Sequence, residues 1–188
     1  MLENNHQIIL GRAVVADDWS VLRLDDGDAV ESAIVPEGKI IVPLAVWLAQ
    51  RETLAARAAN LEIGVWLAPD ERAETLKGEL DHFAVIAIDF PKFTDGRGYS
   101  TAYNLRQRLG YKGQLRAIGD VLRDQLFSMQ RVGFNAFDTR PDRSIHDAVK
   151  SLTDFSETYQ ASIDEALPLY RRHARDVRVE AGDVGFGI

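Results

Sequence analysis

Three successive stretches of the sequence each end in residues that could handle an anion. Aspartates there could act as general acids or bases, or could hold Mg²⁺ beside an anionic substrate. Arginines could clamp a negatively charged group. The predicted catalytic candidates are Asp89, Asp120 and Asp138, and the predicted anion-binding candidates are Lys92, Arg97, Tyr99, Arg123, Arg140 and Arg143.

Charge is distributed unevenly along the chain. Residues 89–140 contain nine Lys and Arg against five Asp, whereas the whole chain carries a net charge of −7. A basic segment in an acidic protein indicates a site for an anionic ligand or partner. We call the predicted cluster of loops that follow these strands the basic rim.

Each candidate also has a structural interpretation. Asp120 precedes an apolar-periodic stretch and suits a helix N-cap, and Asp95-Gly96 is a common turn dipeptide. Gly96 and Gly98 could instead let backbone N–H groups approach an anion. Arg97 and Arg123 are expected near helix starts, where the helix dipole disfavours a cation. Each arginine therefore needs either an internal carboxylate or a bound anion.

Composition narrows the function classes. The chain has 188 residues, 46% of them hydrophobic, which is typical of one globular domain. Its acidity argues against nucleic-acid binding, and the absence of cysteine excludes disulfides and cysteine-ligated clusters within the chain. The four histidines are scattered, so no zinc site is expected. Neither a signal peptide nor a membrane span is evident, which predicts a cytoplasmic protein.

The middle of the chain alternates between short apolar runs and longer amphipathic stretches. The predicted strands are 40–42, 61–67, 83–90, 115–118 and 134–137. The run 83–90, FAVIAIDF, is typical of a strand buried on both faces of a parallel sheet. Predicted helices follow them at about 43–59, 69–80, 99–109, 120–132 and 144–160.

About five βα units predict an α/β fold with a mostly parallel sheet, either open or part of a β/α barrel. Residues 1–38 are expected to form a small β-rich extension, with a turn at 25–28 and with Trp19 packed rather than binding. Residues 39–165 form the βα repeat, and residues 166–188 form a tail with a short helix. We expect one compact domain overall, with the candidate residues at the carboxyl ends of the strands.

The segment IDFPKFTDGRGYS followed by LRAIGDVLRDQLFSMQRVGFNAF resembles the uncharacterised bacterial family DUF934. Members are commonly labelled as oxidoreductases involved in sulfite reduction. The resemblance implies an accessory protein of assimilatory sulfite reduction that binds sulfite reductase, or an anionic ligand, through the basic rim. It supplies no catalytic residues and no cofactor.

Two other readings stay open beside it. One is a small α/β enzyme that acts on an anionic substrate by aspartate acid–base or Mg²⁺-assisted chemistry. The other is a scaffold whose acidic surface mediates assembly, and a homo-oligomer is compatible with each reading. Because the chain lacks cysteines and a dinucleotide fingerprint, it is not expected to be the catalytic subunit of the reductase.

Overall fold

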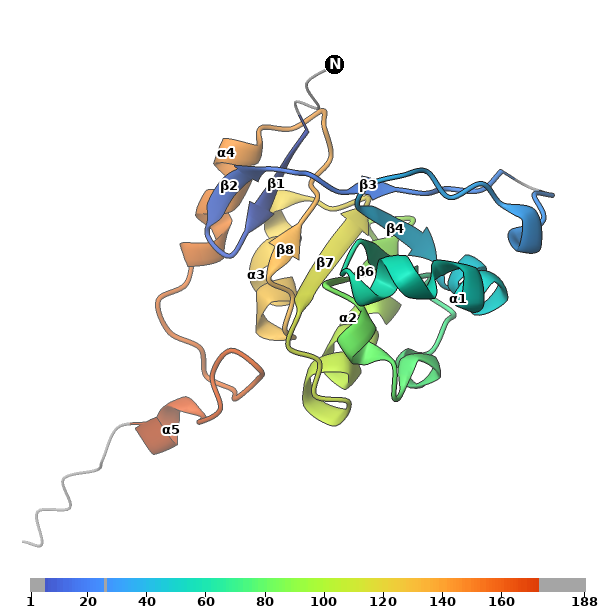
Figure 1. Ribbon diagram of the computed structural model, residues 1–188. Coiled ribbons are helices and arrows are strands. Elements are labelled where there is room, and N and C mark those ends of the chain that lie inside the picture. The colour runs from blue at the N-terminus through green and yellow to red at the C-terminus, as the bar shows by residue number, and fades with distance from the viewer. Residues whose placement is uncertain (1–5, 26, 173–188) are drawn as a thin grey trace, which may run out of the picture.

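The computed structural model describes residues 6–25 and 27–172, which form a curled, eight-stranded sheet with helices packed on one face (Figure 1). The strand order is β2-β1-β8-β7-β6-β5-β4-β3. The strands are β1 Gln7–Leu10, β2 Ala13–Ala16, β3 Ser20–Val21, β4 Ile40–Pro43, β5 Ile63–Leu67, β6 Val85–Phe90, β7 Gln114–Gly119 and β8 Ala136–Phe137.

The helices are short apart from the first. They are α1 Leu44–Ala59, α2 Arg97–Tyr103, α3 Arg123–Arg131, α4 Ile145–Ala148 and α5 Leu169–Arg172. Single turns add η1 Val30–Ser32, η2 Ala73–Leu76, η3 Leu80–His82 and η5 Val149–Thr153, and η4 Asn104–Arg108 continues α2 as a π-helix. Among the described residues, no helix is long and apolar enough to cross a membrane.

The predicted α/β class and mostly parallel sheet are confirmed. Strands β3 to β8 pair in parallel and in chain order, and only β1 and β2 run antiparallel to their neighbours. All six residues of β6 are buried, as expected for the apolar run at the centre of the sheet. This order and the curvature resemble part of a β/α barrel more than an open doubly wound sheet.

The alternation of side chains along each strand gives the sheet two different faces. Ile86, Ile88 and Phe90 belong to the large core under the helices. Val85 and Ala87 belong to a smaller core on the opposite, concave face, together with Ile118 and Trp19. The concave face is therefore covered by the chain itself and not by helices.

The N-terminal residues are rich in β structure, as predicted, but their three short strands lie at both edges of the sheet and do not form one separate extension. A hairpin of β1 and β2, turning at Gly11 (φ +61°), extends the sheet beyond β8, whereas β3 pairs with β4 at the far edge. At the predicted turn 25–28, the Asp28 N–H donates to the Asp25 carbonyl (3.1 Å), although Asp26 is not among the described residues. After β2 the chain crosses the concave face to the far edge of the sheet, and we call residues 17–24, which include β3, the crossing segment (Figure 1).

One predicted helix was wrong, and another begins as predicted but ends early. Residues 69–80 form turns instead, including η2, and Gly78 (φ +89°) interrupts any continuous helix. The predicted helix 144–160 ends within η5 by Thr153, because the residues beyond it have no apolar face to bury: Phe155 is 64% exposed.

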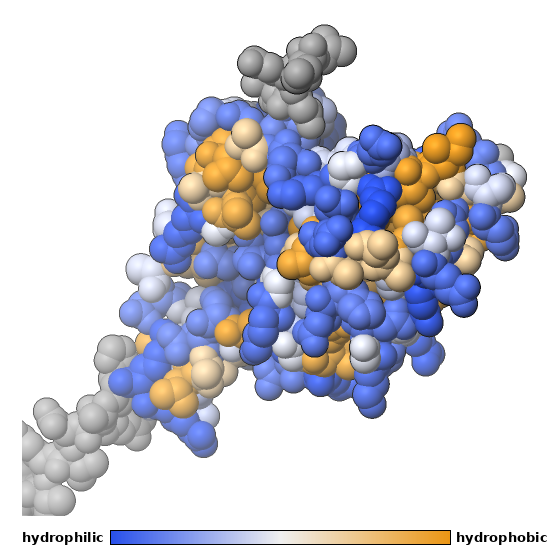
Figure 2. Space-filling view, in the orientation of Figure 1, coloured by the Kyte–Doolittle hydropathy of each residue, from blue (hydrophilic) through white to orange (hydrophobic). Residues whose placement is uncertain are grey.

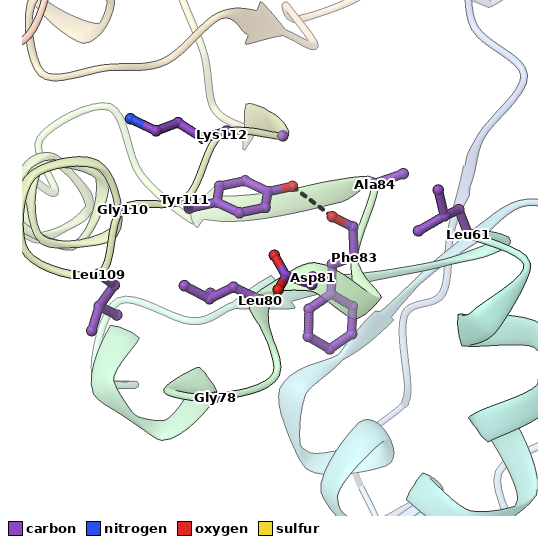
Figure 3. A pocket seen from close by; sticks show the side chains of 11 residues that line it. Leu61, Gly78, Leu80, Asp81, Phe83, Ala84, Leu109, Gly110, Tyr111 and Lys112 are labelled. Atoms are coloured by element: carbon purple, nitrogen blue, oxygen red, sulfur yellow. Dashed lines mark hydrogen bonds between the residues drawn. The ribbon is translucent and has the colours of Figure 1, made fainter.

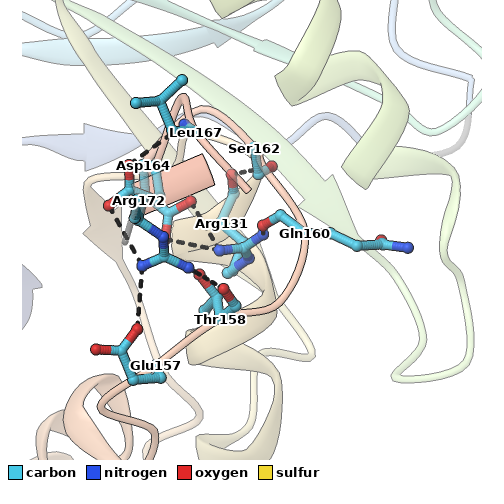
Figure 4. Close-up of polar contacts among 9 residues, drawn as sticks. Arg131, Glu157, Thr158, Gln160, Ser162, Asp164, Leu167 and Arg172 are labelled. Atoms are coloured by element: carbon cyan, nitrogen blue, oxygen red, sulfur yellow. Dashed lines mark hydrogen bonds and ion pairs between the residues drawn. The ribbon is translucent and has the colours of Figure 1, made fainter. Parts of the chain in front are cut away.

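The segment after η5 is held to α3 by polar contacts. Arg131 forms an ion pair with Asp164 (3.2 Å), and its carbonyl accepts from the Ser162 hydroxyl (2.6 Å); Arg172 contacts Glu157 (3.2 Å) (Figure 4). The expected short helix of the tail corresponds to α5. The rest of the tail, residues 173–188, lies outside the described residues.

Leu126→Ala and Met129→Ala should each lower the free energy of unfolding by about 2–5 kcal/mol, because both side chains of α3 are fully buried and truncation leaves a cavity. Denaturant titration of the purified variants measures this. Ser128→Ala, at an exposed position of the same helix, is the control and should change it by less than about 0.5 kcal/mol. Equal effects at all three positions would contradict the assigned helix face.

Candidate functional site

The three predicted loops lie at the same edge of the sheet. Parallel pairing sets Phe90 beside Gly119, and Ala117 beside Phe137, so the chain leaves β6, β7 and β8 in one direction. Asp120 joins the loops: it accepts from the Phe93 N–H (2.9 Å) and from Arg140 Nη1 (3.1 Å). The basic rim is thus one continuous surface.

Asp120 is not a helix cap. Helix α3 begins at Arg123 with Leu122 at the N-cap, and the Gln125 amide oxygen accepts from the Leu122 N–H (3.0 Å). The Gln125 amide also donates to the Phe93 carbonyl (3.0 Å). Both side chains therefore serve to position the loop after β6.

The arginines of the rim are paired with carboxylates of this chain. Arg97 forms two hydrogen bonds to Asp95, at 3.0 and 2.7 Å, and Arg140 forms two to Asp142, at 2.9 and 2.8 Å. Hydrogen bonding to Arg97 lowers the pKa of Asp95, and hydrogen bonding to Asp142 and Asp120 raises the pKa of Arg140. The sequence left two partners open for Arg97, an internal carboxylate or a bound anion, and the structure shows an internal carboxylate.

The arginines near α3 are also paired with carboxylates of this chain. Arg123 lies 2.9 Å from Asp147 and 3.6 Å from Asp154, and Arg143 lies 3.8 Å from Asp142. Of the predicted cations, Lys92 differs, because none of the ion pairs among the described residues includes it. Lys92 and its neighbour Phe93, 41% exposed, extend the rim outward.

Tyr99 lies away from these ion pairs. Its ring packs edge-on against Phe90, with the centroids 5.7 Å apart, and partial burial raises the pKa of its hydroxyl. It lines a separate hollow of about 440 Å³ with Tyr103 and Arg108. The structure therefore does not bring Tyr99 together with the rim arginines.

The predicted acidic residues are also divided between two places. Asp120 lies on the rim, but Asp89 lies on the concave side and accepts from Arg23 at 2.7 Å. The Arg23 guanidinium stacks over Trp66, 4.7 Å from the ring centroid. Asp138 pairs with His6 at 3.0 Å. A single catalytic triad of these aspartates is therefore not formed.

A buried ion pair on the concave face was missed by the sequence analysis. The guanidinium of Arg116 on β7 binds both carboxylate oxygens of Asp17, at 2.7 and 2.9 Å, with side chains 0% and 3% exposed. Turned with its oxygen toward Arg116, the Gln114 carboxamide accepts from Nε and Nη2 at 2.9 Å. The sequence held one hint of this ion pair, an arginine inside the apolar strand segment LRAI. Because side chains alternate along a strand, this arginine had to lie on one face of the sheet.

Asp138 is electrostatically coupled to this buried pair. Burial raises the pKa of its carboxyl, whereas His6 and Arg116 oppose the rise and Asp17 adds to it. His6, Asp17 and Arg116 thus make the concave end of β8 a polar site, in contrast to the apolar middle of that face.

Two hollows lie at opposite edges of the sheet. One of about 570 Å³ adjoins the rim and has an apolar floor of Val121, Leu122 and Ala148 with Arg123 and Arg143 around it. The other, of about 430 Å³, lies where strands β5 to β7 begin, and Tyr111 beside it donates to the Phe83 carbonyl (3.0 Å) (Figure 3). Sites of parallel α/β folds lie at the carboxyl ends of strands, which favours the first hollow.

The described residues contain no group of three or more His, Cys, Asp or Glu side chains placed to hold a metal ion. The rim carboxylates are instead engaged by arginines. The described residues therefore offer no group of ligands for the Mg²⁺ ion that the sequence had suggested.

A family profile described as "Bacterial protein of unknown function (DUF934)" matches residues 64–170. The chain belongs to this family. The match extends from β5 to α5 and includes the rim, whereas the crossing segment precedes it. No curated protein matches the chain.

Asp138→Asn should change how stability depends on pH. Because burial raises the folded-state pKa of Asp138, the aspartate favours folding most below its unfolded pKa, and this contribution is lost as pH rises through the folded pKa. We therefore compare the free energy of unfolding of the wild type with that of Asp138→Asn. The wild-type value minus the Asp138→Asn value should decrease as the pH is raised from below the usual pKa of aspartate. Urea titrations across the acid range measure this; a difference that rises instead would contradict the burial of this carboxyl.

Proposed function

We propose that this member of the DUF934 family is a cytoplasmic accessory protein of assimilatory sulfite reduction that docks on sulfite reductase through the basic rim. The observation that carries the docking part is the pairing of Arg97, Arg123, Arg140 and Arg143 with carboxylates of the same chain. The resemblance of the rim segment to its family supports the pathway.

Paired arginines are a poor clamp for a small anion. An incoming sulfite would compete with carboxylates that already form bidentate bonds to Arg97 and Arg140. It would also meet the negative charge of those same carboxylates. Small-anion binding at the rim is thus disfavoured by the arrangement that holds the rim together.

A protein partner can use the same pairs without breaking them. Arginine and aromatic side chains are enriched at protein interfaces. Phe93 is exposed, follows Lys92 in the sequence, and donates its N–H to Asp120, which also accepts from Arg140. The apolar floor of the adjoining hollow offers a pocket for one partner side chain. The rim therefore suits recognition of a folded protein more than capture of an ion.

The alternative is a small enzyme acting on an anionic substrate. Its support is the hollow between Arg123 and Arg143. Against it, none of Asp89, Asp120 and Asp138 lines that hollow. Asp89 and Asp138 lie instead on the concave side, paired with Arg23 and His6. Calorimetric titration with sulfite and sulfate distinguishes the two: saturable binding at the rim favours the enzyme.

Phe93→Asp combined with Arg143→Glu should weaken binding to purified sulfite reductase by about tenfold or more, because it removes an exposed aromatic anchor and reverses a rim charge. Melting should be almost unchanged, since both side chains are exposed. Surface-immobilised reductase measures the affinity. Lys112→Glu, an exposed reversal at the opposite edge, is the control and should bind like wild type.

The pathway is tested by deleting the gene and supplying sulfur sources. The deletion strain should grow on sulfide but not on sulfate or sulfite, and the wild-type gene should restore growth. The rim variant should fail to restore it at matched protein level, whereas Lys112→Glu should succeed. Normal growth of the deletion strain on sulfite would refute a role in this reduction.

A further inference from the structure

The hollow of about 440 Å³ beside α2 and η4 is a polar feature of the surface, and it shares no lining residue with the hollow at the rim. It is lined by Tyr99, Ser100, Tyr103, Asn104, Arg108 and Val132. Apolar side chains on the face seen in Figure 2 gather elsewhere, in the region of β2 and α4. The hollow beside α2 is therefore not part of that apolar patch.

The π-helix η4 brings Arg108 to this hollow. In an uninterrupted α-helix, Arg108 would lie about 140° around the axis from Tyr103 and about 180° from Tyr99. In η4 the Leu109 N–H instead donates to the Asn104 carbonyl, five residues back (3.0 Å), so residues five apart lie above one another. Tyr103 and Arg108 are five apart. Such π turns within α-helices are frequent at functional sites.

The polar side chains of the hollow are free to bind a ligand. Within the described part of the chain, no hydrogen bond or ion pair involves the side chains of Tyr99, Ser100, Tyr103, Asn104 or Arg108. The rim arginines differ, because they are paired with carboxylates. A few polar groups that converge on one hollow are typical of a site for a small molecule.

One end of the hollow carries positive charge. Arg106 donates to the carbonyls of Gly133 (2.8 Å), Tyr111 (2.8 Å) and Gly113 (2.9 Å), and it thereby lies beside Val132. Neither Arg106 nor Arg108 forms an ion pair with any residue that the structure describes. Two guanidinium groups without a carboxylate partner favour an anion at this end.

Arg108 is not needed to cap its helix. A cation in the last turn of a helix often hydrogen-bonds the free carbonyls there. In η4 these carbonyls accept from the backbone instead: Asn104 accepts from the Leu109 N–H, and Leu105 accepts from the Tyr111 N–H (2.9 Å). The Arg108 guanidinium is thus left available for a ligand.

The two ends of the hollow suit different parts of one elongated molecule. Tyr99 and Arg108 are nine residues apart, which is about 13 Å along a helix and more than an inorganic anion spans. Burial and, to a smaller extent, the charge of Asp124 raise the pKa of the Tyr99 hydroxyl, so a ligand's negative charge belongs at the Arg108 end. Tyr103, 39% exposed, offers its ring for stacking.

We propose that this hollow binds a nucleoside monophosphate, with the phosphate on Arg108 and the base against Tyr99 and Tyr103. Tyrosine rings stack with any base. The Ser100 hydroxyl and the Asn104 carboxamide each offer a donor and an acceptor to the edge of a base. An arginine suits a phosphate group. This site is separate from the rim and does not depend on the docking proposal.

Calorimetric titration with the monophosphates of adenosine, guanosine, cytidine and uridine tests the ligand class. At least one should bind saturably with a Kd of about 1 mM or tighter. Its nucleoside and inorganic phosphate should each bind at least about tenfold more weakly, because each retains only one of the two contacts. Absence of saturable binding by all four, or inorganic phosphate that binds as tightly, would overturn the proposal.

Substitutions assign the binding to the hollow. Arg108→Gln should weaken binding of the best monophosphate by about tenfold or more, and Tyr103→Ala by about fivefold or more. Lys112→Gln is the control, because Lys112 is an exposed cation outside this hollow, and it should bind like wild type. All three variants should melt like wild type, since the side chains are exposed. Wild-type affinity of Arg108→Gln would contradict the site.

Amide chemical-shift mapping by NMR locates the ligand independently of the variants. The shifts that saturate with the monophosphate should centre on residues 99–108 and on Val132. Shifts centred on the loops after β7 and β8 would place the ligand at the rim and overturn this site. Phe93→Asp combined with Arg143→Glu should bind the monophosphate normally, so loss of docking and loss of this site are distinguishable.

Discussion

The arrangement of this protein depends on the buried ion pair between Arg116 and Asp17. A guanidinium in a central strand of a sheet is strongly unfavourable unless a carboxylate neutralises it. That carboxylate comes from the crossing segment, 99 residues away in the sequence. The same segment packs Trp19 on the concave face, bonds its Leu22 carbonyl to Trp66 Nε1 (2.9 Å) and brings Arg23 to Asp89. The concave face is thus closed by a segment that one buried charge holds in place.

Closing that face has a consequence at the rim. Arg23 and His6 engage Asp89 and Asp138 from the concave side, so these aspartates are withdrawn from the surface where Asp120 lies. What remains at the rim is a set of arginine–carboxylate pairs joined by Asp120 around an exposed Phe93. Such a surface resembles a protein interface more than a catalytic pocket. Function at the rim is therefore proposed as recognition.

The sequence predicted those parts of the fold that depend on residues close together in the chain. The buried run at β6, the helix opened by Pro43 and the common edge of the three loops follow from hydrophobic pattern and parallel pairing. The partners of Arg116, Asp89 and Asp138 could not be predicted, because each comes from the N-terminal residues, far away in sequence. The predicted helix at 69–80 failed because a charged, amphipathic composition does not reveal that Gly78 adopts a positive φ and that only short turns fit the connection.

A double-mutant cycle on Asp17 and Arg116, read as free energy of unfolding, tests the account most directly. Asp17→Asn and Arg116→Met should each cost about 3–5 kcal/mol, because each leaves a buried partner without its counter-charge. The double variant should cost clearly less than the sum, which shows coupling. The exposed pair Lys39–Asp18 is the matched control, with an expected coupling of about 0–1 kcal/mol. Additive, small effects at Asp17 and Arg116 would contradict the claim that this pair fixes the crossing segment on the sheet.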